Sequence, residues 1–423
     1  MDTDILIAGS GCSGLYCALN LPADKKITII TKSDVEKSDS YLAQGGICVL
    51  KNDEDYESFF EDTLKAGHYE NDRKSVEIMI KSSRDVINDL VGFGADFSKN
   101  EDGSFNYTKE GAHSDSRILF HRDITGKEIT SKLLKEARRR DNITILEYTT
   151  LLDIIEKNGE CVGAVLAMPD RSIEKIEAEY VVLACGGVGG LYKHSTNFKH
   201  LTGDAIAIAI KHGVQLKDMD YVQIHPTTLY TEGKWDRSFL ISESVRGEGA
   251  LLYDKHMKRF TDELQPRDKL TEKIKIQMKK DNTEYVWEDL RPIGQEEIFS
   301  HFPNIAAHCK DNNYDVTKEC IPVVPAQHYF MGGIKVDYNS RTSMNRLYAI
   351  GETACNGVHG KNRLASNSLL ESLVFAKRAA KEIGNNSVHK EELPFVDVSV
   401  YYDKQALKDE YKELVLEEIN RRR

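Results

Sequence analysis

The chain begins with a strand, a glycine loop, a helix and a second strand. Asp4 to Ala8 is a short apolar segment that runs into Gly9-Ser10-Gly11-Cys12-Ser13-Gly14. Apolar residues at helical spacing follow from Leu15 to Leu21, and the β-branched segment from Ile27 to Thr31 predicts a second buried strand. Such a unit implies a parallel sheet, and its glycines let the backbone approach a pyrophosphate at a helix N-terminus. The sequence therefore predicts an α/β fold that binds a dinucleotide, with a tight turn used only for packing as the alternative.

The end of the second strand distinguishes two dinucleotides. Proteins of this fold that bind NAD carry an acidic residue there, which bonds a ribose hydroxyl. This chain has Thr31-Lys32-Ser33 at that place. The sequence therefore disfavours a generic NAD dehydrogenase and favours FAD.

Later segments predict how the chain divides into domains. Between about Asp218 and Phe330 the strand–helix alternation is lost, and it returns with a strand at Asn345 to Ile350. We expect residues 1–218 and 331–393 to form a Rossmann-like FAD-binding domain. An α+β capping domain over residues 219–330 interrupts it, and residues 394–423 form a short helical tail. Further expected elements are strands at Ile143 to Ile155, Cys161 to Met168 and Tyr180 to Ala184, a hairpin turn at Lys157-Asn158-Gly159, and helical segments at Ser58 to Leu90, Ser368 to Ile383 and Lys404 to Arg423.

Composition excludes several other classes of protein. The 423 residues are 40% hydrophobic and 30% charged, and no apolar run approaches the roughly 20 residues that span a bilayer. The net charge of −11 disfavours general binding to nucleic acid. None of the eight cysteines forms a C-x-x-C pair, so we expect no metal site. With no secretory signal at the N-terminus, we expect a cytoplasmic protein with reduced thiols.

The chain carries a series of short motifs in a fixed order. Together they resemble the succinate dehydrogenase/fumarate reductase flavoprotein superfamily, and the resemblance extends from Asp4 to about Ile383. The motifs are A-Q-G-G at Ala43 to Gly46, A-C-G-G at Ala184 to Gly187 where the family usually has A-T-G-G, T-G-D at Thr202 to Asp204, Q-I-H-P-T at Gln223 to Thr227, R-G-E-G at Arg246 to Gly249, Q-P-R-D at Gln265 to Asp268, and the long block from Gly351 to Leu370.

The resemblance implies how FAD is held. In membrane-bound members a histidine links covalently to the flavin, and Asp39 stands in that place here. We therefore expect non-covalent FAD. Glu352 would accept the ribitol hydroxyls, and the helix that begins at Ser368 and Leu369 would stabilise negative charge on the reduced flavin. The expected cofactor residues are Gly9, Ser10, Gly11, Cys12, Ser13, Gly14, Lys32, Ser40, Ala43, Gln44, Gly45, Gly46, Asp204, Glu352, Ser368 and Leu369.

A second motif points to the substrate. The pattern E-G-x-H-S-x-x-R-I from Glu110 to Ile118 is similar to aspartate oxidases rather than to their dicarboxylate relatives. L-Aspartate is a succinate frame with an ammonium group, so a specific site needs one additional carboxylate. The resemblance assigns that role to Glu110, although an isolated acid in a charged loop is more often an exposed residue.

The dicarboxylate itself needs cations and hydrogen-bond donors. By resemblance, His225, His328 and Arg363 bind carboxylates, and a guanidinium suits a carboxylate bidentately. Ser242 corresponds to a hydroxyl donor, and Gln223 lies one strand period from His225, so both can face the same cleft. Arg267 resembles the arginine that shuttles a proton, or else it anchors and polarises the substrate, since a guanidinium is almost never deprotonated. Taken singly, these residues would be ordinary buried histidines and surface arginines.

The resemblance implies FAD-dependent oxidation of L-aspartate to iminoaspartate by hydride transfer to flavin N5. Oxygen or fumarate would reoxidise the flavin, and the reaction would begin de novo NAD biosynthesis, with quinolinate synthase as the next enzyme. A soluble fumarate reductase is the alternative enzyme, and a flavin-binding electron carrier without turnover is the alternative class. Aspartate oxidases usually end in a three-helix domain, of which only Pro394 to Arg423 could form a remnant here.

Overall fold

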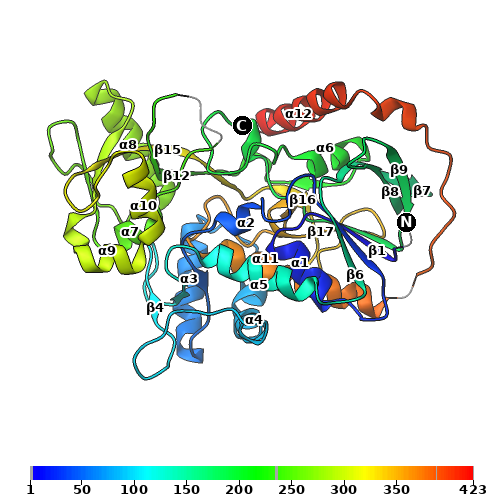
Figure 1. Cartoon of the computed structure of the whole chain (residues 1–423), viewed down its shortest axis with the longest axis horizontal. Coiled ribbons are helices and arrows are strands. Elements are labelled where there is room, and N and C mark those ends of the chain that lie inside the picture. The colour runs from blue at the N-terminus through cyan, green and yellow to red at the C-terminus, as the bar shows by residue number, and fades with distance from the viewer. Residues whose placement is uncertain (1–2, 234–236, 387, 423) are drawn as a thin grey trace.

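The computed structural model describes residues 3–233, 237–386 and 388–422 (Figure 1). Its centre is a five-stranded parallel sheet in the order β17-β10-β1-β2-β6. The β1–helix–β2 unit at the N-terminus is the one expected from the glycine loop, so the predicted α/β fold class is confirmed. The five strands are β1 (Ile5–Ala8), β2 (Ile27–Ile30), β6 (Ile143–Leu146), β10 (Tyr180–Leu183) and β17 (Leu347–Ala349).

Both faces of the parallel sheet are covered. Successive side chains of a strand point to opposite faces, so Ile5 and Ile7 of β1 join one hydrophobic cluster while Leu6 and Ala8 join another. In Figure 1 one group of helices lies below the sheet, and α6 (Asp204–Lys211) lies above it. The helices of the lower layer are α1 (Cys12–Asn20), α4 (Arg73–Gly92), α5 (Thr125–Ala137) and α11 (Asn367–Asn385).

An antiparallel sheet packs on the side of α6. It consists of β7 (Thr150–Lys157), β8 (Glu160–Ala167) and β9 (Ile173–Glu177). Asn158 and Gly159 have φ of 55° and 81°, which confirms the hairpin turn expected between β7 and β8. The segment expected to be extended from Ile143 to Ile155 divides between two sheets, because the chain turns at Tyr148, whose φ is 54°.

The middle of the chain forms a mixed helical and antiparallel unit, at the left of Figure 1. Its four strands have the order β12-β15-β14-β13, and a separate hydrophobic cluster between Leu229 and Val323 forms its core. This α+β character agrees with the expected capping domain, whose boundaries remain a prediction. The elements are β12 (Val222–Leu229), α7 (Glu243–Gly247), β13 (Leu251–Tyr253), α8 (Arg267–Asp281), β14 (Val286–Asp289), α9 (Gln295–His301), α10 (Pro303–Asp311) and β15 (Ile321–Phe330).

Shorter elements join these units and border the site. They are α2 (Asp39–Leu42), β3 (Ile47–Cys48), α3 (Tyr56–Ala66), β4 (Tyr107–Thr108), β5 (Ile118–Leu119), β11 (Leu216–Lys217), β16 (Gly333–Lys335) and β18 (Ala354–Cys355), with single 3₁₀ turns at Asp53–Asp55, Gly189–Leu191, Arg291–Ile293, Gly351–Thr353 and Val398–Tyr401.

The C-terminal segment ends in α12 (Lys404–Arg421), the helix expected there. It packs along α6, as Figure 1 shows, and Tyr411 donates a hydrogen bond to the carbonyl of Leu152 at 2.6 Å. Val415 is fully buried, and its methyl groups lie 3.3 Å from the place where a Cβ on Gly203 would stand. Across the described ranges, no helix is long and apolar enough to cross a membrane.

Replacing Val415 with alanine tests whether α12 is an integral part of the core. Two buried methyl groups are lost, so we expect the free energy of unfolding to fall by about 2 kcal/mol. Urea denaturation followed by circular dichroism measures it. Glu417→Ala, on the exposed side of the same helix, is the control and leaves stability within about 0.5 kcal/mol. Equal stability of the two variants would show that α12 is not anchored to the core.

Candidate functional site

A large cleft extends from the first glycine loop to the capping unit. It contains about 1640 Å³ of space free of protein atoms, part of it open to solvent. All but two of the residues expected at the site line this cleft. The exceptions are Gly14 and Gln223, and the residues that line it are Gly9, Ser10, Gly11, Cys12, Ser13, Lys32, Ser40, Ala43, Gln44, Gly45, Gly46, Glu110, Asp204, His225, Ser242, Arg267, His328, Glu352, Arg363, Ser368 and Leu369.

The first glycine loop has no room for side chains. A Cβ on Gly9, whose φ is 126°, would lie 1.9 Å from the carbonyl oxygen of Ala184. A Cβ on Gly14 would lie 2.1 Å from the oxygen of Gly9. Gly14 therefore brings α1 against β1, while Gly9 and Gly11 leave the cleft open beside the first turn of α1. This is the backbone approach that a pyrophosphate needs at a helix N-terminus.

The second glycine pair is equally crowded on its protein side. A Cβ on Gly46 would lie 2.3 Å from Ile118 and 2.4 Å from the oxygen of Leu119. The Gly46 amide donates to Ser366 Oγ at 3.2 Å. These contacts press the A-Q-G-G backbone against β5 and turn its other side toward the cleft.

Several buried polar atoms in the cleft find no hydrogen-bond partner among the described residues. They are Ser38 Oγ, Asp39 Oδ2, Gln44 Oε1, His225 Nε2 and Arg363 Nε. Buried polar groups are nearly always hydrogen-bonded, so these atoms indicate contacts made to a bound molecule. With the glycine-lined backbone, they fit a large polar cofactor with a phosphate bridge.

Two carboxylates of the cleft, Asp39 and Glu352, are half-buried. Asp39 accepts a hydrogen bond from the Phe198 amide at 3.0 Å, and burial raises its pKa to about 7. Glu352 accepts from the Phe330 amide at 2.9 Å, and burial, followed by the charge of Asp39, raises its pKa to about 8. Elsewhere in the cleft, Lys32, which follows β2, forms an ion pair with Asp204 at 2.7 Å. The positive charge of Lys32 is therefore balanced within the protein.

Arg267 is held by two side chains at the start of α8. Its Nε donates to Glu243, and its NH1 donates to Gln223 Oε1 at 2.8 Å. Burial raises the pKa of Glu243, but the charges of Arg267 and Arg246 outweigh this effect, and the pKa is lowered overall. Gln223 donates to the carbonyl of Arg363 at 2.9 Å. It was expected to face the cleft, but it does not line it, and its side chain bonds to Arg267 and to the Arg363 backbone. The pairing of β12 with β15 is irregular directly after Gln223.

Two histidines and Arg363 share the same end of the cleft. The rings of His225 and His328 are 5.0 Å apart, and burial, with the charge of Arg267, lowers the pKa of both well below the usual value. Arg363 lies over the ring of Tyr329 at 4.5 Å and donates to Ser368 Oγ at 3.0 Å. Burial and the charge of Arg267 lower the pKa of Arg363 to about 10. Both arginines therefore supply positive charge, while the imidazoles are uncharged.

The carboxylate of Glu110 is buried in the same cleft and not exposed. Ser244 donates to its Oε1 at 2.6 Å, and Ser366 donates to its Oε2 at 2.5 Å. Burial raises the pKa of Glu110, and the charge of Glu243 raises it further, while the two hydroxyls act in the opposite direction. The residue is only 3% exposed, and a Cβ on Gly45 would lie 2.7 Å from its Oε1.

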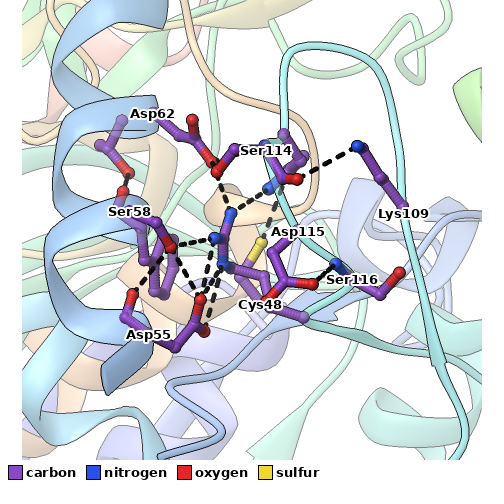
Figure 2. A network of polar contacts seen from close by, with 12 residues as sticks. Cys48, Asp55, Ser58, Asp62, Lys109, Ser114, Asp115 and Ser116 are labelled. Atoms are coloured by element: carbon purple, nitrogen blue, oxygen red, sulfur yellow. Dashed lines mark hydrogen bonds and ion pairs between the residues drawn. The ribbon is translucent and has the colours of Figure 1, made fainter. Parts of the chain in front are cut away.

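The loop that carries Glu110 is fixed to α3 by a buried ion-pair network, which Figure 2 shows. Arg117 is fully buried and pairs with Asp55 at 2.9 Å and Asp62 at 2.6 Å. Arg117 also donates to His113 Nδ1 at 3.1 Å, and the Ser114 amide donates to Asp62 at 2.7 Å. The network holds Ser114 and Arg117 of this loop against α3 and the residue that precedes it.

His113 extends this network to the Arg363 loop. Its Nε2 lies 3.0 Å from the carbonyl of Ala365, and burial lowers its pKa to about 4. A neutral imidazole that accepts from Arg117 therefore donates to Ala365, two residues after Arg363. The two loops that bring Glu110 and Arg363 into the cleft are thus joined through one histidine.

Several residues that hold the predicted side chains in place were missed at the level of sequence, and four of them illustrate why. They are Glu243 beside Arg267, Tyr329 under Arg363, Thr196 bonded to His328 at 2.7 Å, and Ser244 on Glu110. Glu243 directly follows Ser242, and Tyr329 directly follows His328. Their position next to predicted site residues could have identified them. Thr196 and Ser244 had none, because their roles depend on contacts with residues more than 130 positions away.

Comparisons with known proteins agree with this geometry. Residues 4–369 match the family model of an FAD binding domain. An L-aspartate oxidase of Clostridium perfringens is 50% identical over 90% of this chain and 87% of its own length, and one of Clostridium acetobutylicum is 48% identical over 91% and 89%. Among solved structures, an E. coli quinol fumarate reductase FrdA has a TM-score of 0.86 and 29% identity, covering 98% of this chain and 78% of that one.

Replacing Arg117 with methionine tests the network that holds the Glu110 loop. The change removes the only positive charge paired with Asp55 and Asp62 among the described ion pairs, so we expect a loss of about 3–5 kcal/mol in the free energy of unfolding. Arg421→Met is the matched control. Arg421 also forms an ion pair, with Glu418, but its side chain is 72% exposed, so we expect a loss below about 1 kcal/mol. Urea titration of both variants measures the difference. Similar losses in the two variants would show that the network does not stabilise the fold.

Proposed function

Because this chain belongs to the L-aspartate oxidase family of FAD-binding proteins, we propose that it oxidises L-aspartate to iminoaspartate with FAD as cofactor. The observation that carries the proposal is the buried carboxylate of Glu110 in one cleft with Arg267 and Arg363. Two cations suit the two carboxylates of the substrate, and the carboxylate suits its ammonium group. A site for succinate or fumarate alone needs no such carboxylate.

Each substrate group has a partner in this arrangement. Arg363, with His225 and His328 as neutral donors, binds one or both carboxylates, and Ser242 adds a hydroxyl. Arg267 anchors and polarises the substrate, since Glu243 and Gln223 fix its guanidinium in place and hold its charge. These contacts orient Cα toward the cofactor. When bound, FAD accepts a hydride from Cα at flavin N5.

The proposal includes non-covalent FAD. A carboxylate at Asp39 stands where covalent relatives carry the linking histidine, and a carboxylate does not form that bond. The cofactor is held by the backbone at Gly9 to Gly11 and at Gly45 and Gly46, by Lys32 with Asp204, and by Glu352. Ser368 and Leu369, in the first turn of α11, stabilise negative charge on the reduced flavin.

Oxygen or fumarate takes the electrons from the reduced cofactor in this proposal. Fumarate carries the same two carboxylates as the substrate, so the cationic end of the cleft suits it as well. Iminoaspartate then serves quinolinate synthase at the start of de novo NAD biosynthesis. The cytoplasm remains the location predicted from the sequence.

Anaerobic mixing of the FAD-loaded protein with single substrates tests the proposal. We expect L-aspartate to bleach the flavin absorbance within seconds, and D-aspartate and succinate to leave it unchanged over the same time. Stopped-flow absorbance at the flavin band measures this. Bleaching by succinate but not by L-aspartate would identify a succinate or fumarate enzyme instead.

The pH dependence of turnover tests the role of Glu110. The ionised form of this carboxylate pairs with the ammonium group, and its pKa is raised, chiefly by burial. Its charge is therefore lost at a higher pH than for an ordinary glutamate, and kcat/KM for L-aspartate falls as pH drops through that raised pKa.

Glu110→Gln removes this dependence. We expect kcat/KM for L-aspartate to fall by roughly 10- to 100-fold or more, and its dependence on the raised pKa of Glu110 to disappear. Fumarate reduction driven by a reduced viologen dye is spared. Equal loss of aspartate oxidation and fumarate reduction would remove the role proposed for Glu110.

A further inference from the structure

A second, smaller crevice lies on the other side of Glu110. It contains about 240 Å³ of atom-free space, part of it open to solvent. Gln44 and Gly45 line both this crevice and the main cleft. Glu110 lines only the main cleft, and Ser244 lines only the crevice. The hydrogen bond from Ser244 Oγ to Glu110 Oε1 therefore joins the two spaces.

The crevice has a mixed lining, with Phe120 and Phe302 beside several polar side chains. Glu248 and His301, paired at 2.8 Å, line it with side chains that are 20% and 35% exposed. Arg122 lines it as well. A bound water needs two to four polar partners, and the crevice has room for about one water, with Ser244, Glu248, His301 and Arg122 as the polar side chains beside it.

The proposed reaction produces a proton at Glu110. The Cα–H bond of the substrate breaks, and its electron pair leaves with the hydrogen to FAD. The C=N bond forms from the nitrogen lone pair, which becomes available when the ammonium group gives one N–H proton to a base. Glu110 is the carboxylate placed to accept it, and it must lose that proton before the next turnover.

Only one of the two hydroxyls on Glu110 leads away from the main cleft. Ser366 lines that cleft itself and accepts from the Gly46 amide at 3.2 Å. Ser244 accepts from Ser242 Oγ at 3.2 Å on its inner side and borders the crevice on its outer side. While substrate or product fills the main cleft, Ser244 is the hydroxyl with access to solvent.

We propose that Ser244 relays the substrate-derived proton from Glu110 to water in the second crevice. The protonated carboxyl donates to Ser244 Oγ, and the hydroxyl gives its own proton to the crevice, so the side chain ends unchanged. The route rests on the proposed oxidation of L-aspartate, and it separates proton release from the mouth through which the substrate enters.

The test compares the rate of flavin bleaching with the rate of proton release. FAD-loaded protein is mixed anaerobically with L-aspartate in weakly buffered solution, with an indicator dye that absorbs outside the flavin band. In the unmodified protein we expect the proton to appear at the rate of bleaching. Absence of bleaching there would reject the proposed function itself, before the relay is in question.

Ser244→Val removes the hydroxyl and fills its space. Because proton transfer through a positioned side chain contributes about 100-fold or more, we expect proton release to lag bleaching by roughly 100-fold. Ser244→Ala leaves room for a water molecule in place of the hydroxyl. In this variant we therefore expect proton release to lag bleaching by less than in Ser244→Val. Should the valine variant fail to retain FAD, Ser244→Cys, with its weak thiol donor, replaces it.

Ser366→Ala is the matched control, because it also removes one hydroxyl from Glu110 but does not border the crevice. Its bleaching slows through loss of the hydrogen bond, while proton release still keeps pace with bleaching. A purely structural role of Ser244 would slow both processes together. Proton release that keeps pace in Ser244→Val, or lags equally in Ser366→Ala, would overturn the relay.

Discussion

The ion pair between Arg267 and Glu243 lies almost completely out of water, and the substrate end of the cleft is organised around it. A buried charge costs several kcal/mol unless it is paired and its remaining donors are satisfied. Gln223 meets part of that requirement by accepting from Arg267 and donating to the backbone at Arg363. Because these groups are held in place before a substrate arrives, the site can discriminate by charge without first reorganising.

Glu110 is a second buried carboxylate near the same arginine, and its position depends on segments far apart in the chain. Arg117 anchors its loop to α3, His113 joins that loop to the one that follows Arg363, and two serines hold the carboxylate oxygens. Ser244 belongs to the capping unit, whereas Ser366 lies at the N-terminus of α11. Glu110 therefore receives contacts from both main units of the fold, which makes it sensitive to how they pack.

Local patterns predicted the parallel sheet, and the family resemblance placed nearly all of the expected site residues in the cleft. The pattern that marks Gly9 is local, although the contact that requires a glycine there is with the distant carbonyl of Ala184. Gly14 packs α1 against the Gly9 backbone, and its expected contact with the cofactor stays a prediction. Gln223 was misjudged because strand alternation holds only for regular pairing, and β12 is irregular beside Ile224. The roles of Ser244 and Thr196 depend on residues distant in sequence, so no local pattern could reveal them.

The central claim is that Glu110 selects the ammonium group while the arginine end binds the carboxylates. A crystal structure of the FAD-loaded protein, reduced with dithionite and soaked with L-aspartate, tests it most directly. We predict the ammonium nitrogen within about 3 Å of a Glu110 carboxylate oxygen, with the substrate carboxylates on Arg363 and the two histidines. A substrate bound with its ammonium group directed away from Glu110 would contradict the account.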